Sequence, residues 1–128
     1  MEITANELQT VLENQNVQFT DTVVPGKACT MHRPGSGLVS LKGLTNQCRA
    51  RFKVSFGANI GIPTGGTVDS ISLALAIDGE PIATTTMIVT PAAVEEYFNV
   101  FTSVYLDIPR GCCSTISVRN ISLQSIDV

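Results

Sequence analysis

A strict two-residue alternation at residues 71–77 is the feature that most limits how this chain can fold. Large apolar side chains occupy every second position there, and small residues stand between them. This period is typical of a β-strand that places one face against a hydrophobic core. The Asp-Gly-Glu-Pro sequence at residues 78–81 then predicts a reversal of the chain, because Asp-Gly favours hairpin turns and proline donates no ladder hydrogen bond. Residues 82–89 are therefore expected to return as the second strand of a hairpin.

The same alternation recurs along the chain and predicts an antiparallel all-β domain. Residues 50–58 form the cleanest example, and residues 98–108 repeat the pattern with apolar side chains at the even positions. Shorter strands are expected at residues 17–24, 29–32, 38–44 and 114–121. Turn residues separate these segments, and no long helical pattern interrupts them. The predicted fold is an antiparallel β-sandwich of jelly-roll type.

The N-terminal segment, residues 1–16, carries the one helical signal. Thr4 and Glu7 have the spacing of a capping box, and apolar residues follow at helical intervals. A helix of about ten residues is marginal alone in water, so the segment is expected either to fray as an arm or to dock on a larger assembly. We therefore divide the chain into an anchor segment and a jelly-roll domain at residues 17–128. The candidate anchoring side chains are Leu8, Val11 and Leu12.

Composition narrows the classes of partner. Charged residues make up 15% of the chain, against about 25% in ordinary globular proteins, which predicts a surface partly covered by copies of the chain or by another protein. A net charge of −3 argues against nucleic acid as a partner, since nucleic-acid binders carry a basic stripe. No apolar run is long enough to span a membrane, and no secretory signal pattern begins the sequence. The chain is thus expected to be made and assembled in the cytosol.

Two sets of residues are candidates for contact between subunits. Phe101 and Tyr105 fall on the odd, outward positions of the strand at residues 98–108, and outward aromatic side chains are typical of interface cores. The alternative is a second packed layer within one subunit. Small residues on the outer face of the strand at residues 71–77 would let another sheet or subunit approach closely. These are Ser72, Ala74 and Ala76.

The four cysteines leave three alternatives open. Cys29 and Cys48 are isolated, whereas Cys112 and Cys113 are adjacent, so the paired spacing of zinc sites is missing. Buried free thiols are one possibility, and a cytosolic origin favours them. A disulfide from Cys29 or Cys48 to one member of the adjacent pair is the second alternative, and a metal site is the third.

The sequence contains few residues or motifs that could act in catalysis. His32 is the single histidine, and the sequence contains no nucleophile elbow, phosphate loop or zinc-protease motif. We therefore expect no enzyme, no catalytic residues, no metal and no cofactor, with a small hydrolase or isomerase using His32 as a remote alternative. A second alternative is a surface adhesin that binds a host glycan through residues 33–37 or 60–67. Neither loop contains the aromatic residue that glycan sites usually display.

Several stretches resemble known proteins. The sequences SISLALAIDGEPI, IPRG and TISVRNIS resemble the trimeric tumour necrosis factor-like jelly rolls of bacterial collagen-like proteins and phage virions. The stretches LENQNVQFTDTVVPG, GLTNQCRARFKVSFGANIGIPTGG and IVTPAAVEEYFNV are similar to small proteins encoded among structural genes of gut Firmicutes phages.

The resemblance implies a homotrimer in which one sheet of each subunit packs around a three-fold axis. The implied role is a capsid decoration or head-fibre protein of the virion, attached to the major capsid protein or another virion protein through residues 1–16. The resemblance carries over no catalytic residues. The alternative role, head of a bacterial surface protein, is weakened because the sequence has no Gly-X-Y collagen stalk.

Overall fold

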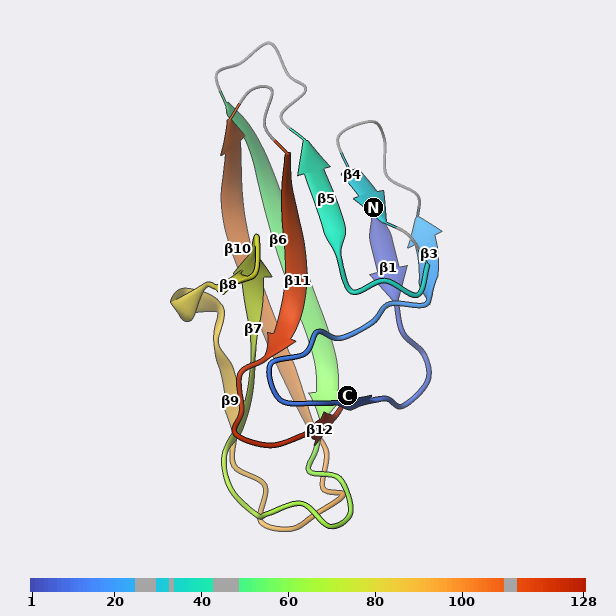
Figure 1. The fold of residues 1–128 in the computed structure, drawn as a ribbon, viewed down its shortest axis with the longest axis vertical. Coiled ribbons are helices and arrows are strands. Elements are labelled where there is room, and N and C mark those ends of the chain that lie inside the picture. The colour runs from blue at the N-terminus through green and yellow to red at the C-terminus, as the bar shows by residue number, and fades with distance from the viewer. Residues whose placement is uncertain (25–29, 33, 43–48, 110–112) are drawn as a thin grey trace.

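The computed structural model describes residues 1–24, 30–32, 34–42, 49–109 and 113–128, and this part of the chain is all-β. Figure 1 shows the long strands stacked as two layers. The strands in chain order are β1 (Glu2–Thr4), β2 (Thr10–Val11), β3 (Asp21–Val24), β4 (Thr30–His32), β5 (Val39–Lys42), β6 (Arg49–Ile60), β7 (Ile71–Ile77), β8 (Glu80–Pro81), β9 (Met87–Val89), β10 (Phe98–Pro109), β11 (Cys113–Asn120) and β12 (Ile126–Asp127).

One layer is a sheet with the order β4-β5-β11-β7-β8, in which β9 also pairs with β7. The other layer is built on β6 and β10, which pair without interruption from Phe98 opposite Ile60 to Pro109 opposite Arg49. β12 pairs with β2, and a bridge between Gly61 and Asp127 connects β12 to the end of β6. β1 and β3 form a further antiparallel pair. Every pairing among the described strands is antiparallel, so the predicted all-β class is confirmed, and the two layers are consistent with a β-sandwich.

The core lies between the layers. β7 and β11 supply side chains from one sheet, and β6 and β10 supply them from the other, as the two-residue alternation predicts. The buried hydrophobic residues of the main cluster are Val11, Val17, Phe19, Phe56, Ile60, Ile62, Ile71, Leu73, Leu75, Met87, Val100, Val118 and Ile126. Each fully buried aliphatic side chain contributes about 1.5–3 kcal/mol relative to leaving it in water, so this cluster is the main source of stability.

In the hairpin predicted at residues 71–89, the first strand is confirmed, whereas the returning strand differs from the prediction. β7 has the predicted bounds, and Asp78 and Gly79 turn the chain with φ angles of 50° and 86°, the pattern of a tight hairpin turn. The returning segment is broken by a 3-10 turn at Ala83–Thr85 between β8 and β9. At the break, the buried Thr85 hydroxyl accepts a hydrogen bond from the Leu75 N–H (3.0 Å), so a side chain replaces a ladder partner.

The predicted N-terminal helix is wrong. The segment instead contains β1, which pairs with β3, and β2, which pairs with β12. Strand pairing satisfies the backbone here, whereas a short helix would need a separate surface to pack on. Val11 is 3% exposed and lies in the main core, so residues 1–16 are packed on the domain rather than set apart from it. Within the described residues, no helix has the length and apolarity needed to cross a membrane.

Candidate self-association surface

The outer face of the β6–β10 pair is the surface that carries the predicted aromatic residues. Both strands are twelve residues long and keep one register throughout, so their odd-numbered residues lie opposite one another on this face. Phe101 is 65% exposed and Tyr105 is 64% exposed. The prediction that these two side chains point away from the core is confirmed. We call this face, with its five facing pairs from Asn59–Asn99 to Arg51–Asp107, the aromatic face.

The polar pairs on the aromatic face are already bonded to each other. The Asn99 amide donates to Asn59 Oδ1 (3.2 Å), and the hydroxyls of Ser55 and Ser103 lie 3.1 Å apart. Such cross-strand pairs stabilise a sheet and use up the polar groups that would otherwise seek partners. The exposed apolar groups on this face are the rings of Phe101 and Tyr105.

The charged pair at one end of the aromatic face is also internally matched. Arg51 Nε lies 2.9 Å from Asp107 Oδ1, and Nη2 lies 3.4 Å from Oδ2. The hydrogen bond that Arg51 donates to Asp107, together with the negative charge of that carboxylate, raises the pKa of the Arg51 guanidinium above its ordinary value. Exposed ion pairs of this kind add little stability, but they remove net charge from the face.

Each aromatic ring contacts the residue opposite it on β6. Phe101 lies over Gly57, where an added Cβ atom would stand 3.4 Å from Phe101 Cδ2. An aromatic side chain that covers a cross-strand glycine supports the strand locally, so part of the Phe101 ring serves the subunit itself. Lys53 Nζ lies 6.0 Å from the centre of the Tyr105 ring, within range of a weak cation–π contact. Most of both rings nevertheless faces solvent.

The small residues predicted as a second contact are not available for one. Ala74 and Ala76 are fully buried within the subunit. Arg119 lies opposite Ala74 on the same face, and its Nη1 donates to the Gly79 carbonyl (2.7 Å) at the far end of β7. The arginine side chain therefore runs along this face. Ser72 is half-buried, and its N–H donates to Ser122 Oγ (2.7 Å).

The predicted anchor residues separate into two environments. Val11 is a core residue, as described above. Leu8 and Leu12 are 66% and 60% exposed, so both keep apolar surface that a partner could cover. Their role in anchoring stays a prediction.

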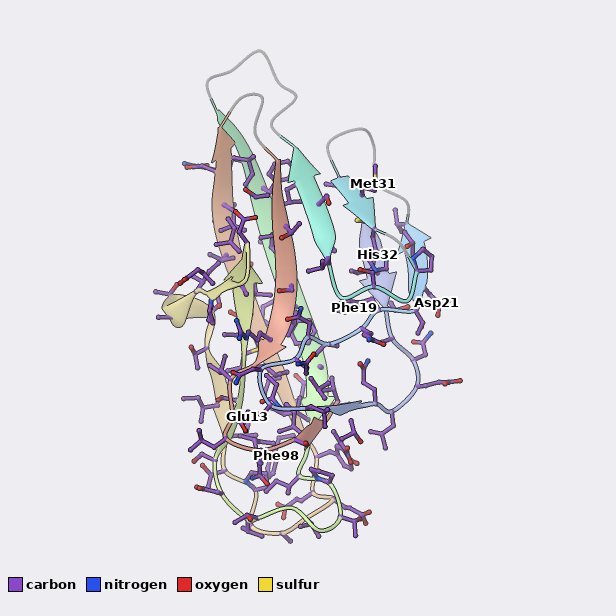
Figure 2. The ribbon with its side chains drawn as sticks, viewed as in Figure 1. Glu13, Phe19, Asp21, Met31, His32 and Phe98 are labelled. Atoms are coloured by element: carbon purple, nitrogen blue, oxygen red, sulfur yellow. The ribbon has the colours of Figure 1, made fainter. Side chains whose placement is uncertain are left out.

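His32 is held by hydrogen bonds on both ring nitrogens. Nδ1 lies 2.9 Å from the Thr22 hydroxyl, and Nε2 lies 3.0 Å from the Ser36 carbonyl. Because a carbonyl only accepts, Nε2 carries the proton and Nδ1 accepts from Thr22 in the neutral ring. Figure 2 shows His32 close to Phe19, and the two rings meet edge to face at 6.2 Å.

The loop at residues 63–67 forms a shallow hollow of about 330 Å³ with Gln124 and Ser125. No aromatic ring lines the hollow, and the Gln124 amide is already bonded to the backbone of Thr67 (2.9 and 2.7 Å). The residues of this loop thus offer few free groups to a sugar. In the second predicted glycan loop, Arg33 lies outside the described residues, while Gly35 turns the chain with a φ of 86°.

The cysteine alternatives stay predictions. Cys29, Cys48 and Cys112 lie outside the described residues, as does the side chain of Cys113. Among the side chains that the structure describes, no three histidine, cysteine or acidic residues gather as a metal site would require.

Sequence reasoning missed the residue that joins the chain ends. Asn120 is fully buried, and its amide bonds to the N-terminal segment and to the C-terminal tail. An asparagine among alternating apolar residues near the end of a predicted strand was the available signal.

Comparisons with known proteins add no family: no family model matches the chain, and a search of curated proteins finds no match.

Proposed function

We propose that this chain is a non-enzymatic structural subunit of a bacteriophage particle, a homotrimeric capsid decoration or head-fibre protein. The observation that carries the proposal is the exposure of Phe101 and Tyr105 on a strand pair whose polar neighbours already bond to one another. Covering the two rings removes apolar surface from water, and the bonded polar pairs beside them can keep their partners when the face is covered. Covering a phenylalanine-sized ring contributes about 2 kcal/mol.

The order of the strands supports a jelly roll of the tumour necrosis factor-like type. Strands far apart along the chain are neighbours, with β5 beside β11 and β6 beside β10. The chain passes from one layer to the other between β5 and β6, between β6 and β7, between β9 and β10, and between β10 and β11. Such repeated crossing between two antiparallel sheets is typical of jelly rolls. In the resembling proteins, one sheet of each subunit faces the three-fold axis, and the aromatic face belongs to the layer that we assign to this role.

A trimer suits attachment to a shell. Three identical subunits present three copies of each weak contact, and the second and third contacts form at high effective concentration once the first is made. We assign the attachment to the exposed side chains of Leu8 and Leu12 on the N-terminal segment. Since Val11 is part of the core, removal of residues 1–16 would also damage the fold, so attachment has to be tested by surface substitutions.

The first test is the mass of the purified protein in solution, measured by light scattering with and without reductant. We expect a trimer in both conditions, and a monomer in the double variant Phe101→Ser, Tyr105→Ser. Leu123→Ser is the matched control, because Leu123 is 90% exposed and lies outside the aromatic face. A monomeric wild-type protein, or a double variant that stays trimeric, would overturn the assignment of this face.

The second test concerns the particle. Electron microscopy of particles assembled with and without this gene product should show extra density at three-fold or quasi-three-fold positions only when it is present. Absence of the protein from purified particles would contradict the virion role while leaving the trimer result unaffected.

A further inference from the structure

An apolar cavity of about 560 Å³ lies between the layers and reaches the gap between β1 and β6. Its lining includes every residue at positions 52–58 of β6 and every residue at positions 1–6. Successive side chains of a strand point to opposite faces, so a cavity that touches each residue in turn lies along the strand's edge. The β6 edge therefore forms one wall of the cavity. We call the cavity, with the edge of β6 at residues 53–59, the β6 slot.

The direction of the β6 main chain follows from its two neighbours. Gly61 exchanges two hydrogen bonds with Asp127 of β12, from Gly61 N to Asp127 O (3.0 Å) and from Asp127 N to Gly61 O (2.9 Å). β6 keeps one unbroken register with β10 on its other side. Because main-chain groups alternate between the two edges of an antiparallel strand, the odd-numbered residues direct their N–H and C=O groups toward the β12 side. These are Lys53, Ser55, Gly57 and Asn59.

Along residues 53–59, no strand of the described chain pairs with this edge of β6. Figure 1 shows that β12 is short and lies beside the lower end of β6. The slot therefore continues the line of β12 along β6. A strand placed there would extend the ladder that Gly61 and Asp127 begin.

The charged residues that could protect this edge are turned away from it. Proteins often place lysine or another charged residue on an exposed edge to prevent pairing with other chains. Here Arg51 bonds to Asp107 on β10, and Lys53 Nζ lies near the Tyr105 ring, also on β10. The charged groups of both side chains thus lie toward β10, although Lys53 also contributes to the lining of the slot.

The interior of the slot suits apolar side chains at alternate positions. Val54 and Phe56 line it from β6, and Leu75 and Val118 line it from the facing sheet. Side chains directly opposite each other on paired strands share one face of the sheet. A strand in the slot would therefore need apolar residues opposite Val54, Phe56 and Ala58, and polar residues between them.

We propose that the β6 slot accepts an extended peptide strand of a partner protein, which adds to the free edge of β6 in line with β12. The recognition chemistry is β-augmentation: main-chain hydrogen bonds to Lys53, Ser55 and Gly57 hold the strand, and the apolar cavity selects alternate side chains. A strand spanning residues 53–59 needs about seven residues, or roughly 23 Å. The slot uses the main-chain edge of β6, whereas the aromatic face uses the outward side chains of β6 and β10, so this inference does not require the proposed trimer.

The test uses a fluorescein-labelled peptide, Lys-Thr-Val-Ser-Val-Thr-Val-Ser-Lys, with fluorescence anisotropy on the full chain. The control peptide has the same composition in the order Lys-Thr-Ser-Val-Val-Val-Thr-Ser-Lys, which cannot place three valines on one face. We expect saturable binding of the first peptide and at least about tenfold weaker binding of the second, because its apolar side chains cannot all enter the cavity.

Ser55 provides matched variants. Ser55→Pro removes an N–H that faces the slot and no main-chain hydrogen bond to β10, together with the hydroxyl that lies 3.1 Å from Ser103 Oγ. Ser55→Ala removes the same hydroxyl and keeps the N–H. Loss of the N–H is expected to weaken the alternating peptide by about tenfold in the proline variant, with little change in the alanine variant. Hydrogen exchange on the wild-type protein gives a second reading that needs no variant. Bound peptide should slow exchange at Lys53, Ser55 and Gly57 and leave the even-numbered amides of β6 unchanged.

Three outcomes would overturn the proposal. The first is no binding of the alternating peptide, or equal binding of both peptides. The second is exchange at these amides that, without peptide, becomes slower as the protein concentration increases. This result would assign the slot to a second copy of the chain. The third is saturable binding of laurate without binding of peptide, which would make the cavity a site for a small apolar molecule. The Phe101→Ser, Tyr105→Ser variant changes the aromatic face and leaves the β6 edge intact, so peptide binding by this variant distinguishes failure here from failure of the trimer.

Discussion

The Nδ2 atom of Asn120 donates a hydrogen bond to the carbonyl oxygen of Val11 (3.0 Å), which joins two residues 109 positions apart in the chain. The same amide group also donates to the Leu12 carbonyl (3.3 Å) and to the Gln124 carbonyl (2.9 Å), and its oxygen accepts from the Ser122 N–H (2.9 Å). One buried side chain thus holds the N-terminal segment and the C-terminal tail against the end of β11.

Replacement of this amide should be costly. Asn120→Ala removes a donor from the Val11 and Gln124 carbonyl groups and the acceptor of the Ser122 N–H, and an unsatisfied buried polar group costs about 1–3 kcal/mol. We expect the free energy of unfolding in urea to fall by about 3 kcal/mol. Asn99→Ala is the matched control, because Asn99 is exposed and makes a single cross-strand bond, so its loss should cost less than about 0.5 kcal/mol. Similar losses in the two variants would contradict the role of Asn120.

The Thr85 side chain, which takes the place of a main-chain hydrogen-bond partner of β7, leads to a second prediction. The Thr85 hydroxyl accepts from the Leu75 N–H and donates to the Ile82 carbonyl (2.7 Å). Thr85→Val keeps the shape and removes both bonds, so we expect a loss of about 1–3 kcal/mol in the free energy of unfolding. Thr84→Val, at an exposed neighbour in the same turn, should change stability by less than about 0.5 kcal/mol. Equal values for the two variants would show that the turn does not depend on this hydroxyl.

The environment of Tyr97 predicts that the free energy of unfolding falls at alkaline pH. Partial desolvation of the phenol, which is 42% exposed, together with the charge of Asp127 (3.4 Å from the hydroxyl), raises the pKa of Tyr97 above its ordinary value of 10.0. Folding therefore favours the protonated phenol, so this contribution is complete below pH 10 and is lost as the pH rises through the folded-state pKa. Ultraviolet titration of the Tyr105→Phe variant, in which Tyr97 is the only tyrosine, should give a midpoint above 10.0.

Asp127→Asn in the same background should lower that midpoint, because the carboxylate charge is removed while an oxygen remains for the hydroxyl to bond. A midpoint that does not move would assign the shift to burial alone. Tyr97→Phe should flatten the fall in stability above pH 10.

Attachment to a particle should depend on exposed apolar residues of the N-terminal segment. Leu8→Ser with Leu12→Ser removes most of this surface without touching the core, so we expect loss of co-sedimentation with capsids and an unchanged thermal midpoint. Val23→Ser is the control, since Val23 is a similarly exposed apolar residue on β3 (57%). Retained co-sedimentation of the double variant would rule out these leucines as the anchor.

The local pattern predicted the long strands well. The alternation at residues 50–58, 71–77, 98–108 and 114–121 corresponds to β6, β7, β10 and β11. Their core faces are largely as expected, with Val100 and Ile108 buried, while Phe98 at the start of β10 stays partly exposed. The capping-box pattern at Thr4 failed because four residues of local signal compete poorly with strand partners supplied by β3 and β12.

The sequence by itself determined the long strands and most of the side chains in them that turn inward, because a strand with one buried face must alternate, and alternation is a local property. Only the tertiary structure decided which strands are neighbours, since pairing β6 with β10 or Val11 with Asn120 depends on contacts between distant parts of the chain. The burial of Ala74 and Ala76 and the free edge of β6 belong to this second class. Both arise from what the rest of the chain places beside a strand, which its own residues do not encode.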